Sequence, residues 1–267
     1  MLQFPKDRFS LNLFSIPFLS SIGSDFTIVY NRKSELEAFT LYRALSQLSE
    51  KVVRLVNLYD FLFSEKPYAD VNNVIAFLHD KNDVIHFLDS MWSLGGKGYL
   101  ITCNVDMKKE KGKGDVEILS KEGELCEIET SLSLLKEISS INKNKRSEEI
   151  LKELNSLNTL EEWLKEKVKE VDFNGLIVLS PLLLPARNLM QKYLNTEIKS
   201  HEDFLGSSNT YTFITTGADV LTVRRMEFEL RAKGKNVREI IFDVDPLLAP
   251  VYLSILTYLF KQPARVL

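Results

Sequence analysis

Residues Val71–Asn104 read VNNVIAFLHDKNDVIHFLDSMWSLGGKGYLITCN, and this stretch decides the fold. Val74–Leu78 and Tyr99–Thr102 are short apolar runs, whereas Asp83–Leu94 places apolar residues at helical spacing and is closed by a glycine-rich segment. A strand–helix–strand unit with uncharged strands is typical of a parallel sheet that is buried on both faces. Ligands bind beyond the carboxyl ends of such strands, so a functional site is predicted at the turn Leu78–Asp83.

The composition is that of a globular protein. The 267 residues are 45% hydrophobic and 27% charged, and no apolar run approaches the ~20 residues of a membrane span. The first residues mix charges and proline with apolar side chains, so we do not expect a signal peptide. We therefore expect a cytoplasmic protein without a membrane partner.

The charge distribution gives no sign of a nucleic-acid partner. The chain has 34 basic and 37 acidic residues, for a net charge of −3. The basic cluster Lys108–Lys113 contains no aromatic residue that could stack on bases. A solvated loop is the expected structure of this cluster.

Neither the cysteines nor the histidines predict a metal site or a cofactor. Cys103 and Cys126 lack the spacing of metal ligands, and we expect both to be reduced structural residues. His79 and His86 could share a helix face, but the pattern supplies no third ligand.

A strand followed by a helix recurs along the chain. Phe26–Tyr30 predicts a strand and Ser34–Leu48 a helix, in which Ser34 and Glu37 match a capping box. The polar segment Ser139–Ser147 is the candidate linker. We expect an α/β protein of two similar halves, residues 1–146 and 147–267, each a parallel sheet flanked by helices, with the functional cleft between them. The other predicted strands are Val52–Leu55, Val116–Leu119, Leu176–Leu179, Tyr211–Thr215 and Val237–Phe242, and the other predicted helices are Glu127–Ile138, two over Glu148–Val171, Ala186–Leu194, Asp219–Ala232 and Asp245–Phe260.

Three short motifs follow one another along the chain: the strand ending Ile101–Asn104, the pair Glu124 and Thr130, and the segment Glu202–Gly206. In this order they resemble the sugar isomerase (SIS) domain family, which has an Ile-Thr-Asn or Ile-Cys-Asn strand ending, a Glu-x5-Thr element and a Glu-x-x-His-Gly-Pro element. Relatives include the isomerase half of glucosamine-6-phosphate synthase and archaeal phosphosugar isomerases. The resemblance covers most of Asp25–Leu267, and it implies two SIS-type αβα sandwich halves, a homodimer and a sugar-phosphate ligand.

The resemblance also implies an activity, the aldose–ketose isomerisation of a hexose or hexosamine 6-phosphate, or a related synthase-like or deaminase-like reaction. Glu202 matches the family glutamate that moves a proton between C1 and C2, and His201 would assist by opening the sugar ring or polarising a carbonyl. Glu124 would orient sugar hydroxyls, and Thr130 would contact the substrate.

The phosphate-binding turn departs from the family pattern, because Leu78, Asp80 and Asp83 replace its serines and threonine. The two acids also suit the start of the following helix, where they would cap its first turn. Arg32 and Lys33 could hold the phosphate instead, since they stand between a strand and a helix N-terminus. A catalytically lapsed phosphosugar-binding or regulatory protein is therefore the alternative. The predicted substrate-binding residues besides Thr130 are Arg32, Lys33, Ser34, His79 and Lys81.

Overall fold

The computed structural model describes residues 11–20, 25–68, 73–103, 115–156, 160, 163–164, 166–167, 171, 173–203 and 208–261. The chain divides into two compact units: the N-terminal unit, Leu11–Asn155, and the C-terminal unit, built from the residues after Asn155. Several sequence features lie outside the described residues, namely Asn104, Lys108–Lys113, parts of the two helices predicted over Glu148–Val171, and residues 204–206 of the segment Glu202–Gly206.

The N-terminal unit is built on a five-stranded parallel sheet in the order β2-β1-β3-β4-β5. Its strand β3 is buried because apolar residues occupy every position from Val74 to Phe77. At Gly98 in β4, a Cβ atom would lie 2.3 Å from the carbonyl oxygen of Val74, so close pairing of β3 and β4 requires glycine here. The strands are β1 (Asp25–Tyr30), β2 (Val52–Asn57), β3 (Asn73–Phe77), β4 (Lys97–Thr102) and β5 (Asp115–Ser120).

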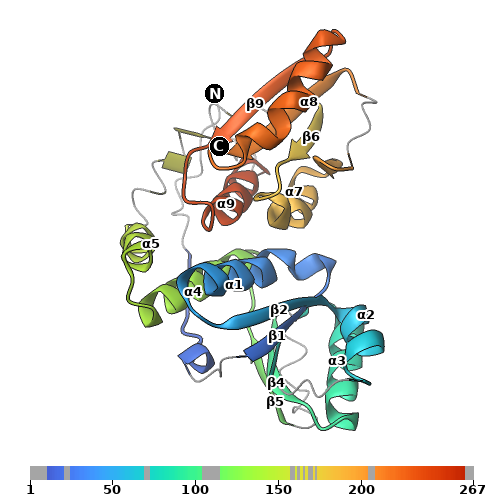
Figure 1. Ribbon diagram of the computed structural model, residues 1–267, viewed down its shortest axis with the longest axis vertical. Coiled ribbons are helices and arrows are strands. Elements are labelled where there is room, and N and C mark those ends of the chain that lie inside the picture. Colours follow the sequence, from blue (N-terminus) through green and yellow to red (C-terminus); the bar gives the residue numbers. More distant parts are fainter. Residues whose placement is uncertain are drawn as a thin grey trace, which may run out of the picture. The chain divides into compact units, whose positions relative to one another are not determined.

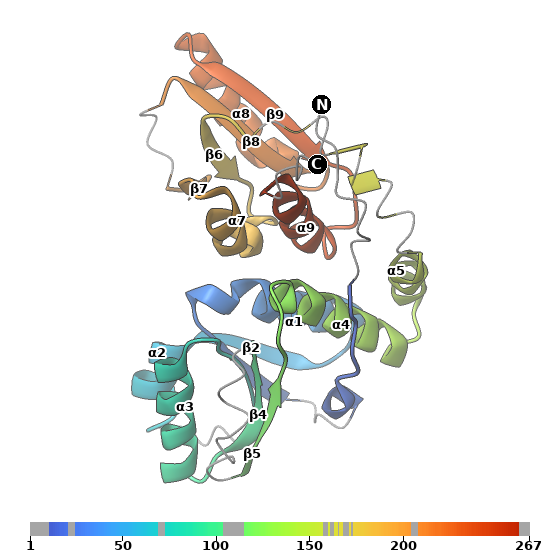
Figure 2. The same cartoon turned by 180° about the vertical axis from the view of Figure 1, so that it is seen from behind.

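Helices cover both faces of this sheet (Figures 1 and 2). Helices α1 and α4 pack against each other on one face, and α2, η3 and α3 cover the opposite face. The core under α2 and α3 includes Phe61, Phe87 and Met91, which are fully buried against the strands. The helical elements are η1 (Pro17–Ser20), η2 (Arg32–Ser34), α1 (Glu35–Leu48), α2 (Leu58–Asp60), η3 (Phe61–Glu65), α3 (Lys81–Ser93), α4 (Cys126–Ile141) and α5 (Lys145–Asn155).

The prediction of a linker at Ser139–Ser147 is wrong, because this segment contains the end of α4, a short turn and the beginning of α5. The side chain of Asn144 joins the two helices to α1, since its Nδ2 donates to the Leu48 carbonyl at 3.0 Å and its Oδ1 accepts from Ser147 N at 2.9 Å. The polar residues of this segment therefore form hydrogen bonds with backbone groups at helix ends, and they do not form a linker. Helix α5 consequently belongs to the N-terminal unit, and the division follows Asn155.

The C-terminal unit contains a four-stranded parallel sheet in the order β7-β6-β8-β9. Helices α7 and α9 pack together on one face, and α8 covers the other (Figure 2). Edge strand β7 was not predicted, because three residues give too short a pattern to recognise. The elements are β6 (Leu176–Leu179), η5 (Leu184–Ala186), α7 (Arg187–Leu194), β7 (Ile198–Ser200), β8 (Thr210–Thr216), α8 (Val220–Ala232), β9 (Asn236–Phe242) and α9 (Ala249–Lys261).

The two parallel sheets flanked by helices confirm the predicted α/β fold class. The last helix begins at Ala249, later than predicted, because Asp245 Oδ1 accepts from Leu247 N at 2.8 Å and holds a turn before it. Within the described part of the chain, none of the helices has both the length and the apolar character needed to cross a membrane.

Candidate functional site

The candidate site lies at the carboxyl edge of the N-terminal sheet, where strand order reverses between β1 and β3. Tyr30 at the end of β1 pairs with Phe77 at the end of β3, so the loops that follow these strands lie side by side. In parallel sheets such a reversal is the usual place for a ligand. The loop after β1 carries Arg32 and Lys33, and the loop after β3 leads into α3 through Asp80.

Asp80 has two roles at this edge. Its Oδ1 accepts from Asn82 N at 3.0 Å and caps α3, as predicted for an acid at this position. Its Oδ2 accepts from Lys33 Nζ at 3.2 Å, across the switch point. The pKa of Asp80 is lowered, chiefly by the hydrogen bond from Lys33 and then by that from the Asn82 amide. The Lys33 ammonium is therefore held by a carboxylate at the switch point.

Asp83 links three elements through hydrogen bonds. Its Oδ2 accepts from Asn31 Nδ2 at 2.6 Å, and its Oδ1 accepts from the Tyr59 hydroxyl at 3.0 Å. The hydrogen bond to Asp83 is the main cause of the raised pKa of Tyr59. The end of β1, helix α2 and the first turn of α3 are thereby linked through one carboxylate.

Ser34 and Glu37 do not form the predicted capping box. The chain first makes the turn η2, whose cap is Asn31, and the Ser34 hydroxyl bonds to Asn31 and to the carbonyl of Phe77. Ser34 is fully buried, and its side chain makes no cap for α1. Glu37 is consequently free of the helix terminus and reaches His79 instead.

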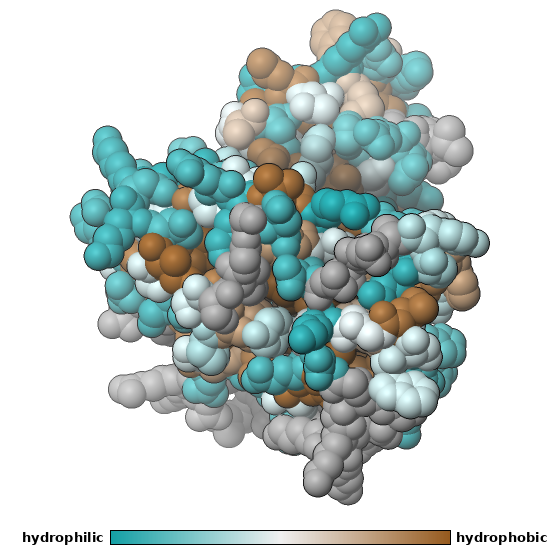
Figure 3. All heavy atoms as spheres, turned by 60° about the horizontal axis from the view of Figure 1, so that its bottom comes forward, coloured by the Kyte–Doolittle hydropathy of each residue, from teal (hydrophilic) through white to brown (hydrophobic). Residues whose placement is uncertain are grey.

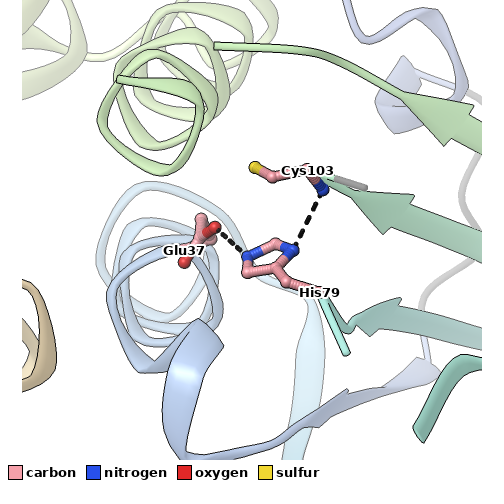
Figure 4. A group of neighbouring side chains, drawn as sticks. All are labelled: Glu37, His79 and Cys103. Atoms are coloured by element: carbon pink, nitrogen blue, oxygen red, sulfur yellow. Dashed lines mark hydrogen bonds and ion pairs between the residues drawn. The ribbon is translucent and has the colours of Figure 1, made fainter. Parts of the chain in front are cut away.

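Glu37, His79 and Cys103 form a hydrogen-bonded chain across the edge of the sheet (Figure 4). The backbone N–H of Cys103 donates to His79 Nδ1 at 3.0 Å, and His79 Nε2 lies 2.7 Å from Glu37 Oε1. Because Nδ1 accepts a hydrogen bond, neutral His79 carries its proton on Nε2 and donates it to Glu37. The Glu37 side chain is 0% exposed, and its Oε2 has no hydrogen-bond partner within the structure described.

The expectation that both cysteines are reduced is wrong, because Cys103 and Cys126 form a disulfide. Cys103 follows β4, and Cys126 is the first residue of α4. Both positions lie at the carboxyl edge of the sheet, and their Cα atoms are 5.9 Å apart, which is normal for a disulfide. Tertiary structure thus joins two residues whose sequence spacing gave no indication of pairing.

Glu37, His79 and Cys103 also form a cluster of the kind that can bind a metal, since one ligand atom from each lies within 4.8 Å of the others. However, both ring nitrogens of His79 are engaged in hydrogen bonds, and the Cys103 sulfur is bonded to Cys126. The geometry is that of a hydrogen-bonded chain next to a disulfide, in which the unpartnered Glu37 Oε2 by itself does not make a ligand set. His86, the predicted neighbour of His79, is exposed on α3.

The other predicted residues of the N-terminal unit have different surroundings. Arg32 and Lys81 are exposed beside the switch point. Glu124 is exposed in the turn before α4, whereas Thr130 is fully buried in α4 with its Oγ1 4.0 Å from the Cys126 sulfur. Thr130 therefore faces the disulfide and not the solvent.

His201 and Glu202 belong to the C-terminal unit, directly after edge strand β7. The His201 amide donates to the Leu179 carbonyl at 3.2 Å, which fixes this segment next to the end of β6. His201 Nε2 lies 3.8 Å from Glu202 Oε1, and the Glu202 side chain is 80% exposed. His201 Nδ1 is buried and has no hydrogen-bond partner in the part of the chain described. The two side chains thus lie within ion-pair distance of each other after the end of β7.

Sequence reasoning missed Glu37, Asn31, Tyr59 and the cysteine pair as parts of this edge. The available signal was topological: residues that follow β1, β2, β3 and β4 all lie at the carboxyl edge of one parallel sheet. Applied to Cys103 and to the helix after β1, that rule would have placed Cys103, His79 and Glu37 near one another.

The fold is similar to that of several solved structures. A glucosamine-6-phosphate deaminase from Thermotoga maritima matches with a TM-score of 0.67 and 12% identity, over 92% of this chain and 86% of its own. The C-terminal domain of a glucosamine-fructose-6-phosphate aminotransferase from Francisella tularensis matches with a TM-score of 0.65 and 10% identity, over 94% and 88%. A tagatose-6-phosphate ketose/aldose isomerase from Escherichia coli matches with a TM-score of 0.58 and 12% identity, over 92% and 84%.

The chain therefore has the sugar isomerase (SIS) type of α/β fold, as its sequence motifs predicted. At this level of identity the likeness concerns the fold, and function has to be argued from the site. No family model matches the sequence, and a search of curated proteins found no significant relative.

Proposed function

We propose that this protein binds a sugar phosphate, a hexose or hexosamine 6-phosphate, at the β1/β3 switch point of its N-terminal unit. The observation that carries the proposal is the placement of three exposed cations at this point: Arg32 and Lys33 in η2, which follows β1, and Lys81 at the start of α3, which follows β3. The backbone N–H groups at a helix N-terminus favour an anion, and Arg and Lys side chains add charge-assisted hydrogen bonds to a phosphate group. The names of structurally similar proteins, which include phosphosugar enzymes, support the same ligand class.

In this proposal Asp80 competes with the ligand for Lys33. A phosphate that enters the switch point must take the Lys33 ammonium from a carboxylate that already binds it at 3.2 Å. Asp80 also occupies the α3 cap, where the family's hydroxyl side chains would face the phosphate. Affinity in the natural sequence is therefore expected to be modest, and removal of Asp80 should increase it.

We propose an isomerase-like reaction as the first form of the activity. Glu202, whose carboxylate is exposed, would transfer the proton between C1 and C2, the role that the family resemblance implies for it. His201 would assist through its ring, whose Nδ1 has no partner in the described structure, and Glu124 would orient sugar hydroxyls. A synthase-like or deaminase-like reaction on an amino-sugar phosphate is the related enzymatic possibility. The proposal requires no cofactor and no nucleic-acid or membrane partner.

One observation favours the second candidate, a catalytically lapsed protein that binds or senses a phosphosugar. Asp80 and Asp83 stand where the family has hydroxyl residues, and Asp83 is already bonded to Asn31 and Tyr59. The turn that corresponds to the family's phosphate-binding turn thus makes structural hydrogen bonds through Asp83. Binding and catalysis must be tested separately for this reason.

Calorimetric titration with fructose 6-phosphate and glucosamine 6-phosphate tests the binding site. Asp80→Ser keeps a capping hydroxyl and frees Lys33, so affinity should rise at least about tenfold. Arg32→Ala should weaken binding about tenfold or more, the value of a charge-assisted hydrogen bond. The matched control is Asp115→Ser, because Asp115 pairs with Lys97 at 3.4 Å at the amino edge of the same sheet. Equal affinity for all four proteins would refute the assigned site.

Catalysis is measured by following fructose 6-phosphate and glucose 6-phosphate by NMR with the natural sequence and Glu202→Gln. Interconversion that is lost in Glu202→Gln, with binding retained, would support the isomerase. Binding without interconversion by the natural sequence would support the lapsed protein.

We also propose a homodimer, on the basis of the family resemblance. Ile150 and Leu154 of α5 are buried, so these apolar side chains are not exposed for contact with a second copy. In Figure 3, hydrophobic residues on the visible face are separated by hydrophilic ones. Light scattering at micromolar concentration tests the proposal, and a monomer mass would contradict it.

A further inference from the structure

The Cys103–Cys126 disulfide joins two points of the carboxyl edge that differ in accessibility. Cys103, directly after β4, is partly exposed, whereas Cys126 is 1% exposed at the start of α4. An incoming thiolate attacks the disulfide sulfur that it can reach. Attack on Cys103 would make Cys126 the leaving group.

The surroundings of Cys126 suit a leaving thiolate. Cys126 is the first residue of α4, a helix of 16 residues, so it stands at the positive end of the helix dipole, which favours negative charge. The Thr130 hydroxyl lies 4.0 Å from the Cys126 sulfur and is buried beside it. Of the two acids in the first turn, Glu129 is paired with Lys121 at 2.7 Å, which offsets its charge. The helix N-terminus and the Thr130 hydroxyl are thus placed to stabilise Cys126 as it leaves.

Cys103 is held in place independently of the disulfide. Its backbone N–H donates to His79 Nδ1, and His79 is fixed in turn by the buried Glu37 carboxylate. Cleavage of the disulfide therefore leaves the Cys103 backbone anchored at the end of β4. The Cys126 backbone is likewise anchored, because its N–H donates to the Gly123 carbonyl at 3.2 Å.

We propose that the Cys103–Cys126 disulfide is a thiol–disulfide exchange site that reacts with dithiols, with Cys103 as the attacked sulfur and Cys126 as the leaving group. A thiolate of the dithiol bonds to the Cys103 sulfur, the Cys103–Cys126 bond breaks, and Cys126 leaves as a thiolate. The second thiolate of the reductant then attacks the reductant sulfur of the mixed disulfide, which forms the oxidised reductant and releases Cys103 as a thiolate. The dithiol loses two electrons and two protons, and the two cysteines gain them.

Trapping the mixed disulfide tests which sulfur is attacked. The folded full-length variants Cys126→Ser and Cys103→Ser each keep one thiol, and each is treated with glutathione disulfide and analysed by mass spectrometry. Cys103 in Cys126→Ser should be modified at least about tenfold faster than Cys126 in Cys103→Ser, because only Cys103 is accessible. Equal rates, or faster modification of Cys126, would overturn the assignment.

The rate of reduction tests the site as a whole. Dithiothreitol should reduce the natural protein without denaturant, and Thr130→Val, which keeps the side-chain shape but removes the hydroxyl, should slow reduction several-fold. Circular dichroism checks that the variant is folded. A disulfide that is reduced only in denaturant, or an unchanged rate in Thr130→Val, would contradict the proposal. Reduced protein whose thiols react with a chromogenic disulfide only after a chelator is added would also overturn it, by indicating that the thiols hold a metal.

Discussion

Removing the Cys103–Cys126 disulfide should destabilise the N-terminal unit by a predictable amount. The two cysteines are separated by 23 positions in the sequence. For a closed loop of this length, the loss of unfolded-chain entropy corresponds to about 3.4 kcal/mol at 25 °C. For a unit of this size, each 1 kcal/mol shifts the unfolding midpoint by roughly 2–4 °C, so the expected decrease is roughly 7–14 °C.

The two tryptophans allow this loss to be assigned to one unit. Trp92 lies on α3 in the N-terminal unit, whereas Trp163 packs against Phe242 and Tyr252 in the C-terminal unit. Thermal unfolding is followed by Trp92 fluorescence in a Trp163→Phe background, with and without Cys103→Ser and Cys126→Ser together. A Trp92→Phe background reports on the other unit, whose midpoint should not move.

Chemical reduction of the natural sequence provides a check that does not depend on the serine substitutions. A phosphine reductant should lower the Trp92 midpoint by the same amount as the double substitution. If thiol titration shows two free cysteines and the midpoint is unchanged within about 1 °C, the disulfide does not restrict the unfolded chain as the entropy argument requires. A shift of the Trp163 midpoint alone would also refute the reasoning, because both cysteines belong to the N-terminal unit.

Two further predictions concern stability. Burial, and then the nearby Glu239 charge, raise the pKa of Glu227 on α8 from 4.5 to about 7, so the folded state binds more protons than the unfolded state between these values. Stability of the C-terminal unit should therefore fall as pH rises from 4.5 to about 7. Glu227→Gln should flatten this part of the stability–pH profile. The measurement is the urea midpoint, read from Trp163 fluorescence at several pH values, and the same dependence on pH in both proteins would disprove the link. Gly98→Ala should destabilise the N-terminal unit by about 1–3 kcal/mol or more, because the new Cβ atom would lie 2.3 Å from the Val74 carbonyl oxygen. An unchanged urea midpoint, read from Trp92 fluorescence, would contradict that steric argument.

Most of the local structure could be predicted from the sequence because it depends on short-range patterns. The apolar run around Ile75 and the helical spacing of Val84, Phe87 and Met91 define β3 and α3 regardless of what they contact. Alternation of such segments requires crossovers and therefore parallel sheets. The loop after β3 could accordingly be assigned to the carboxyl edge of the sheet, where we propose that the ligand binds, before its neighbours were known.

The partners within that edge depended on contacts between distant segments. Ser34 and Glu37 fit a capping box by spacing, yet the turn η2 makes Asn31 the cap and directs Glu37 to His79. The Lys33–Asp80 ion pair spans two strands, so its existence depends on strand order and register. No local pattern contains that information.

The sequence by itself determined the element types, the two parallel sheets and the edge of the first sheet at which we propose a site, because periodicity and strand–helix order are properties of neighbouring residues. Tertiary structure alone decided that Cys103 bonds to Cys126, that His79 lies between Cys103 and a buried Glu37, and that a carboxylate holds Lys33. These pairs form because the ends of parallel strands and the first residues of the following helices converge on one edge, whatever their separation along the chain.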